Sequence, residues 1–99
     1  MVTVASSLAD SAAGASALLE ELGDARVKWV EVFRDRLVLH PAQISEGAAI
    51  AEQLGITVAT DYPASHPGFT LWTGRWKGTE MYVYAELRGS ARPVRAWPT

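Results

Sequence analysis

The segment 61–68 carries the densest set of side chains able to do chemistry. A carboxylate, a phenol, a hydroxyl and an imidazole lie within six residues, on Asp61, Tyr62, Ser65 and His66. Histidine titrates near neutral pH and can act as an acid, a base or a ligand. The segment therefore predicts a small ligand pocket at the edge of a sheet. Its polar groups would be Asp61, Tyr62, His66 and Arg75.

The same segment has a second interpretation, a plain turn. Its sequence, DYPASHPG, holds two prolines, a serine and a glycine, a composition typical of loops. Aspartate can bond its own backbone there, and prolines fix φ. No hydrolase, kinase or nucleotide-binding signature accompanies it. We therefore expect a non-catalytic protein without a cofactor. The alternative is a small ligand-binding domain or enzyme whose pocket lies at residues 61–68.

The sequence offers two further chemistries, metal binding and phosphate binding. The only histidines, His40 and His66, would hold a metal only together with carboxylates such as Asp61 or Glu31. No H-x₃-H or equivalent spacing supports that, so we predict no metal site. The glycines of segment 72–78 could cradle a phosphate, but the Walker spacing and the following helix are missing, which favours a turn.

A β-hairpin over residues 69–87 is the element around which the predicted fold is built. Lys77-Gly78 forms its turn, because a two-residue turn that matches strand twist needs positive φ, which glycine supplies. This places Trp76 opposite Thr79. One face then carries Trp72, Trp76, Met81, Val83, Ala85 and Leu87. The other carries Phe69, Leu71, Thr73, Arg75, Glu80, Tyr82, Tyr84 and Glu86, with Arg75 and Glu80 as an opposite-charge pair.

A first hairpin is predicted over residues 27–41, with Arg34-Asp35 at its turn. A three-residue loop would invert one strand, whereas a two-residue loop gathers the aliphatic side chains and sets Glu31 diagonal to Arg36. We prefer the two-residue loop. One face then holds Val30, Val32, Leu37 and Leu39, and the other Trp29, Glu31, Phe33, Arg36, Val38 and His40.

Two helices are predicted from apolar periodicity and from the residues at their ends. The first begins at Ser7, ends at Gly23, and buries Leu8, Ala12, Ala15, Leu19 and Leu22. The second begins within 42–46, ends at the cap glycine Gly55, and is lined by Ile44, Ala48, Ala51 and Leu54, with Ile50 adjacent. A short strand, 56–60, follows it.

The element order α-β-β-α-β-β-β predicts an α+β protein of two layers. Two helices pack on one face of a mostly antiparallel sheet of four to five strands. Residues 1–87 form a single domain, and residues 88–99 form a basic, extended tail. The second helix would connect the 36–40 strand to the 56–60 strand as a crossover.

Composition and charge exclude several classes of protein. The chain has 99 residues, 48% of them hydrophobic, and no cysteine. No apolar run approaches the roughly 20 residues needed to span a bilayer, so we expect no membrane partner and a cytoplasmic location. Residues 1–87 hold six basic and eleven acidic side chains, a net charge of −5. An acidic body makes nucleic acid an unlikely partner, because phosphate neutralisation supplies most non-specific affinity.

The aromatic content favours self-association. Four tryptophans, three tyrosines and two phenylalanines fall mainly on short strands, with two short helices to cover them. We predict a homo-oligomer, a dimer, formed through an aromatic sheet face or edge. Its interface residues would be Phe69, Leu71, Tyr82, Tyr84, Trp29 and Phe33.

Other functions stay open. The same aromatic face could stack bases as sheet-based RNA binders do, although Glu80 and Glu86 oppose it. The acidic body could instead belong to a regulator of a basic or nucleic-acid-associated partner. The tail from Arg88 to Trp97, with Arg92 and Arg95, could bind a protein partner.

Overall fold

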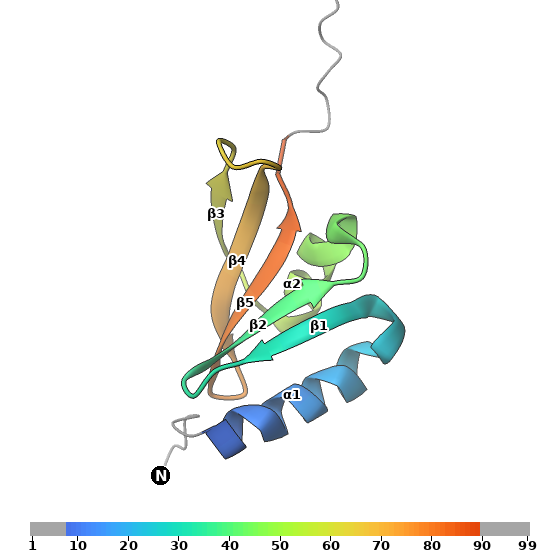
Figure 1. The fold of residues 1–99 in the computed structure, drawn as a ribbon, viewed down its shortest axis with the longest axis vertical. Helices are drawn as coiled ribbons and strands as arrows, with labels where there is room; N and C mark the ends of the chain where they lie inside the picture. The colour runs from blue at the N-terminus through green and yellow to red at the C-terminus, as the bar shows by residue number, and fades with distance from the viewer. Residues whose placement is uncertain (1–7, 90–99) are drawn as a thin grey trace, which may run out of the picture.

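The computed structural model describes residues 8–89. The predictions for Ser7 and for the tail residues Arg92, Arg95 and Trp97 lie outside this range. Two α-helices, two short 3₁₀ turns and five strands make up the described chain (Figure 1). They are α1 (Leu8–Leu22), η1 (Asp24–Arg26), β1 (Val27–Val32), β2 (Arg36–Pro41), η2 (Ile44–Glu46), α2 (Gly47–Leu54), β3 (Val58–Tyr62), β4 (Phe69–Trp76) and β5 (Thr79–Glu86).

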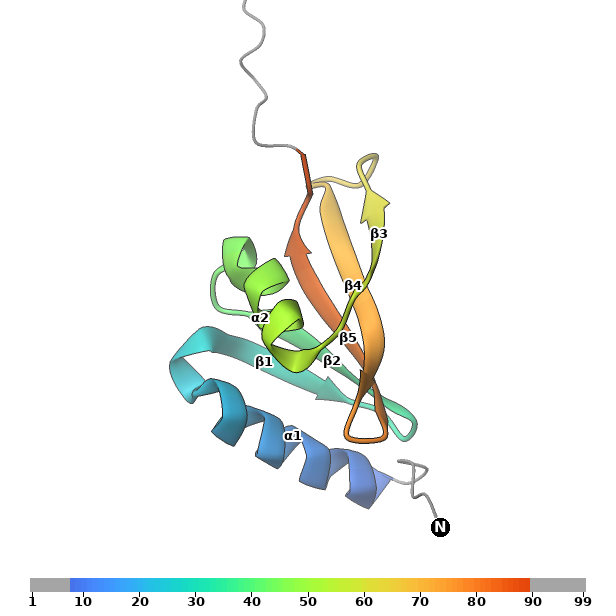
Figure 2. The same cartoon turned by 180° about the vertical axis from the view of Figure 1, so that it is seen from behind.

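The strands form one mixed sheet in the order β1-β2-β5-β4-β3. Three neighbouring pairs are antiparallel, and β2 and β5 are parallel. The predicted α+β class and mostly antiparallel sheet are confirmed. The parallel pair was not predicted. Because β3 runs parallel to β2, α2 does connect two parallel strands of the same sheet, although β5 and β4 lie between them (Figure 2).

The hairpin of β4 and β5 has the predicted register. Trp76 pairs with Thr79 and Arg75 pairs with Glu80. Lys77 and Gly78 have φ of 53° and 80°, as a two-residue turn that follows strand twist requires. The Arg75 guanidinium donates to the carbonyl of Gly78 at 3.3 Å. Among the described residues Arg75 and Glu80 form no ion pair. The two residues are therefore opposite each other, as predicted, but their charges are not in contact.

The first hairpin has the preferred two-residue loop. Val32 pairs with Leu37, and the amide of Phe33 donates to the carbonyl of Arg36 at 2.9 Å. Both Leu37 and Leu39 are completely buried. The predicted contact between Glu31 and Arg36 is replaced by others. Arg36 Nη1 lies 3.1 Å from Asp35 Oδ1, and Glu31 Oε1 lies 3.6 Å from His40 Nε2.

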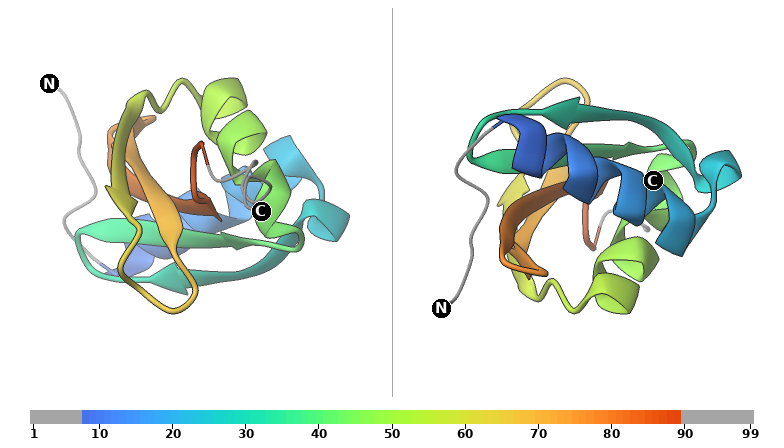
Figure 3. Two further views of the ribbon diagram at one scale, coloured as in Figure 1. Left: turned by 90° about the horizontal axis from the view of Figure 1, so that it is seen from above. Right: turned by 90° about the horizontal axis from the view of Figure 1, so that it is seen from below.

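Both helices lie on one side of the twisted sheet, and α1 runs beneath β1 and β2 while α2 lies against β5 (Figures 1 and 3). Leu18 of α1, Leu37 of β2 and Ile50 of α2 are all completely buried. They belong to one core cluster: Ala15, Leu18, Leu22, Leu37, Leu39, Ile50, Ala51, Leu54, Ile56, Trp76, Met81 and Val83. The predicted two-layer arrangement is thereby confirmed.

The prediction for the buried face of α1 is wrong, because the helix is rotated about its axis relative to the predicted orientation. Leu8 is 51% exposed and Ala12 is exposed, whereas Ser11, Ala15, Leu18 and Leu22 are buried. The small side chain of Ser11 allows close packing, and its hydroxyl donates to the carbonyl of Arg34 at 3.2 Å. A polar residue thus takes a core position that the apolar pattern alone assigned to its neighbours.

The predicted face of α2 and the predicted bounds of β3 are also corrected. Ile44 is 48% exposed and Ala48 is exposed, whereas Gly47, Ile50, Ala51 and Leu54 are buried. Gly47 sets this rotation, because it lies directly against the backbone of β5. After the predicted left-handed cap at Gly55, Ile56 enters the core at 1% exposure. The strand therefore starts at Val58, two residues later than predicted.

Candidate aromatic interface on the open sheet face

The sheet face opposite α1 and α2, here called the open face, is the candidate functional surface. Among residues 8–89, both α-helices pack on the other side of the sheet (Figure 3). Strand pairing places the following side chains on the open face: Trp29, Glu31, Arg36, Val38, His40, Val58, Thr60, Tyr62, Phe69, Leu71, Thr73, Arg75, Glu80, Tyr82, Tyr84 and Glu86.

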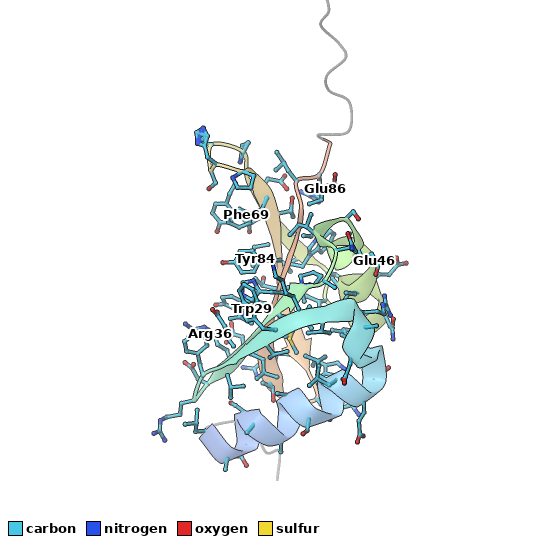
Figure 4. The ribbon with its side chains drawn as sticks, turned by 45° about the vertical axis from the view of Figure 1, so that its right-hand side comes forward. Trp29, Arg36, Glu46, Phe69, Tyr84 and Glu86 are labelled. Carbon is cyan, nitrogen blue, oxygen red and sulfur yellow. The ribbon has the colours of Figure 1, made fainter. Side chains whose placement is uncertain are left out.

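A row of five rings crosses the open face, with one ring from each strand. In strand order the ring row is Trp29, His40, Tyr84, Phe69 and Tyr62. Successive ring centroids are 4.3, 4.7, 5.1 and 4.9 Å apart. Three of these rings are seen following one another across the sheet in Figure 4. Contacts between aromatic rings contribute about 0.5–1.5 kcal/mol beyond area burial, so the row adds side-chain contacts between every pair of neighbouring strands.

A second aromatic cluster lies beside the row. The guanidinium carbon of Arg36 is 4.4 Å from the ring centroid of Phe33 and 5.7 Å from that of Tyr82. Arg36 also pairs in register with Glu80 of β5. This part of the open face therefore combines aromatic surface with charges of both signs.

All six residues predicted for an interface lie on or beside the open face. Trp29 is 47% exposed and Phe33 is 38% exposed, and both come from the β1 side. The other four, Phe69, Leu71, Tyr82 and Tyr84, are half-buried because their neighbours on the face pack against them. At the opposite edge Tyr62, predicted instead as a ligand residue, is 40% exposed. The ring row is thus most exposed at its two ends.

His40 is the member of the row that was not among the predicted interface or ligand residues. Its imidazole stacks between Trp29 and Tyr84. Its Nε2 is buried and has no hydrogen-bond partner among the described residues, with Glu31 Oε1 at 3.6 Å. Strand alternation placed His40 on the same face as Trp29, as observed. The β2–β5 pairing that brings Tyr84 to the other side of His40 has no local sequence signal.

The four residues predicted to share a ligand pocket are not brought together. Asp61 and Tyr62 are successive residues of β3, so their side chains point to opposite faces of the sheet. Tyr62 joins the ring row on the open face. Arg75 lies at the far end of β4, beside the Lys77-Gly78 turn. His66 lies in the loop between β3 and β4.

Asp61 has a structural partner that the sequence analysis placed in the tail. Arg88 Nε and Nη2 donate to Asp61 Oδ1 and Oδ2 at 3.1 and 2.9 Å. Thr70 Oγ1 donates to Asp61 Oδ1 at 2.7 Å and accepts from the amide of Arg88 at 3.0 Å. The hydrogen bonds from Arg88, and then from Thr70, lower the pKa of Asp61. These contacts fasten the end of β5 to the sheet edge.

A cavity of about 520 Å³ lies between the β3–β4 loop and η2. This loop cavity is lined by Ile44, Ser65, His66, Pro67, Gly68, Phe69, Tyr84 and Glu86. Its walls are mostly apolar, and His66 and Glu86 supply polar groups at its rim. The volume falls within the roughly 300–1,000 Å³ of small-molecule sites.

The described residues include neither a metal-binding cluster nor a membrane-spanning helix. No group of three or more His, Cys, Asp or Glu side chains within residues 8–89 is arranged to hold a metal ion. No helix in this range is long and apolar enough to cross a membrane. Comparison with known proteins finds no matching family model, curated protein or solved structure.

Proposed function

We propose that this chain is a small, non-catalytic interaction or assembly protein that binds a second copy of itself through its open face. The observation that carries the proposal is the ring row, which spans all five strands and is most exposed at both ends. Contiguous aromatic surface of this kind is a feature of protein interfaces.

The chemistry of the face supports a self-complementary contact. Aromatic residues and arginine are the residue types enriched in interfaces, and both are present here. The open face carries two arginines and three glutamates, so opposite charges can meet when two copies pack together: Arg36, Arg75, Glu31, Glu80 and Glu86. Two sheets that pack face to face would bury the inner ring row in a layer about 10 Å thick.

The oligomeric state tests this proposal directly. In analytical ultracentrifugation at tens of micromolar, we expect the wild-type protein to sediment as a dimer. Trp29→Glu places a charge at the exposed β1 end of the ring row, on the strand farthest from β3, and should weaken the dimer about tenfold or more. Leu8→Glu is the matched control, because Leu8 is 51% exposed on α1, away from the open face. A wild-type protein that remains monomeric would contradict the proposal.

A second candidate function is the binding of a small ligand in the loop cavity. The observation that favours it is the cavity volume of about 520 Å³ beside His66. A ligand that binds the folded state raises the melting temperature by mass action. In a thermal-shift screen, a bound ligand should stabilise the wild-type protein more than His66→Ala. A compound library without any hit would exclude this candidate and leave the first one standing.

A further inference from the structure

The strand β3 forms one edge of the sheet in the described part of the chain. It pairs with β4 on one side, and no strand of residues 8–89 pairs with its other side. Edge strands are usually protected by lysine, proline or a bulge, because their free backbone groups can bind another strand. Between Val58 and Tyr62 the sequence VATDY contains neither lysine nor proline, and its pairing with β4 is regular.

The side chains of this edge are sorted by strand alternation. Val58, Thr60 and Tyr62 share the open face, and Val58 is 59% exposed, the highest value among the exposed large hydrophobic residues. Asp61, the single charged residue of β3, lies on the other face. Its carboxylate is already paired with Arg88 and Thr70, so its charge opposes an approaching strand less than a free carboxylate would.

We propose that β3 also pairs with β3 of a second copy, antiparallel and with Thr60 opposite Thr60 of that copy. This inference rests on the proposed function only in that the partner is another copy of the chain. The edge contact is made by the backbone of β3, although the side chains of Val58, Thr60 and Tyr62 border the open face. Copies that used both contacts at once would form a tetramer or a longer assembly, so a dimer uses one of the two. The pairing is isologous, so each copy uses the same five residues. The two sheets then join into one continuous sheet.

The register follows from the residues that each alternative would bring together. With Thr60 at the centre, Val58 lies opposite Tyr62 of the other copy, and all five residues are paired. Threonine–threonine pairs, and pairs of an aromatic with a β-branched residue, each contribute roughly 0.2–1 kcal/mol. Centring on Asp61 would oppose two carboxylates. A register centred on Ala59 would place Ile56 opposite Tyr62 of the other copy, but Ile56 lies in the core and is only 1% exposed.

Disulfide trapping tests the register, because the chain has no cysteine of its own. Opposed residues of antiparallel strands have Cα atoms about 4.5–5.5 Å apart, within the range that a disulfide spans. Under mild oxidation, Thr60→Cys should therefore form a covalent dimer. Val58→Cys alone should not, because its two copies would lie four positions apart, roughly 13 Å.

A mixed sample supplies the sharpest control. Val58→Cys and Tyr62→Cys should each stay largely monomeric on non-reducing gels, but their mixture should form the heterodimer. The proposal is overturned if Thr60→Cys cross-links no faster than Val58→Cys, or if the mixture cross-links no more than its separate components. Circular dichroism of each variant verifies that the exposed substitutions leave the fold intact.

The two surfaces fail separately. If Trp29→Glu in the Thr60→Cys background still forms the covalent dimer, the edge contact stands without the open face. If Thr60→Cys does not cross-link but the wild-type dimer is lost in Trp29→Glu, the edge inference is wrong and the proposed function remains. A monomeric wild type whose Thr60→Cys variant also fails to cross-link overturns both.

Discussion

Asp61 of β3 and Thr70 of β4 are paired in register and joined by a hydrogen bond of 2.7 Å between their side chains. Thr70 is completely buried, and its hydroxyl also accepts a hydrogen bond from the amide of Arg88. A carboxylate predicted to bind a ligand therefore holds together the edge strand, its neighbour and the end of β5.

Asp61 should make the stability of the protein sensitive to acid. Its pKa lies below the ordinary value of 3.8 because Arg88 and Thr70 hydrogen-bond to the carboxylate. The stability that the ionised Asp61 carboxylate contributes is therefore fully present above pH 3.8. It is lost as the pH falls through the lower pKa of the folded state. Asp61→Asn should have a lower melting temperature than wild type at pH 7. The difference should shrink in thermal unfolding as the pH falls below 3.8, and a pH-independent difference would contradict this account.

The hydroxyl of Thr70 should matter more than its methyl group. Thr70→Val keeps the shape but removes the donor to Asp61 and the acceptor for the Arg88 amide, at a cost of about 1–3 kcal/mol. Thr70→Ser keeps the hydroxyl and should retain most of the stability. Urea denaturation measures both, and equal losses in the two variants would show that packing, rather than hydrogen bonding, dominates.

Two helical glycines should respond to alanine in opposite directions. A Cβ on Gly47 would lie 2.6 Å from the Cα of Ala85 and closer still to the carbonyl oxygen of Tyr84, both backbone atoms. Gly47→Ala should therefore cost about 3 kcal/mol or more. A Cβ on Gly14 would meet Leu37 Cδ1 at an ordinary 3.5 Å. Gly14→Ala should gain up to about 1 kcal/mol from helix propensity. Chemical denaturation compares the two.

The turn of the β4–β5 hairpin should improve when Lys77 is replaced by asparagine. Lys77 is the one non-glycine residue with positive φ among those described, and asparagine tolerates that region better. Lys77→Asn should raise stability by about 0.5 kcal/mol, and Gly78→Ala should lower it by about 1 kcal/mol. Lys77→Gln removes the same charge without the turn preference, so an equal gain in that variant would point to charge instead.

Both hairpins could be predicted from local sequence. In the second, Gly78 marks the turn, and the alternation of apolar side chains on either side leaves one register that gathers them on one face. In the first, two loop lengths were possible, and only the two-residue loop gathers the aliphatic side chains on one face. A strand period of two fixes a whole face once the turn is known, which explains why Leu37, Leu39, Met81 and Val83 were assigned correctly.

The helix faces could not be predicted in the same way. In α1 and α2 many positions are alanine, serine or glycine, and these residues give the apolar periodicity little contrast. What decides the rotation is how closely a small residue approaches the sheet, as Gly47 does at Ala85. Such a contact depends on a strand that lies more than thirty residues further along the chain.

The four predicted ligand residues are dispersed in the structure because residues that are close in sequence need not be close in space. Asp61 and Tyr62 belong to a strand that starts and ends two residues later than predicted, and adjacent strand residues diverge. The groups that do meet are distant in sequence. Arg88 reaches Asp61 across 27 positions, and His40 reaches Tyr84 through the unpredicted parallel pairing.

The position of β5 at the middle of the sheet constrains how the molecule is made. The pairs β1–β2 and β3–β4 share no direct hydrogen-bonded ladder, and only β5 joins them. A growing polypeptide on the ribosome would therefore carry two separate hairpins, with their apolar sides uncovered, until residues 79–86 leave the exit tunnel. Folding should therefore be completed in a single late step, once residues 79–86 are available, and chaperones would meet the nascent chain before that step.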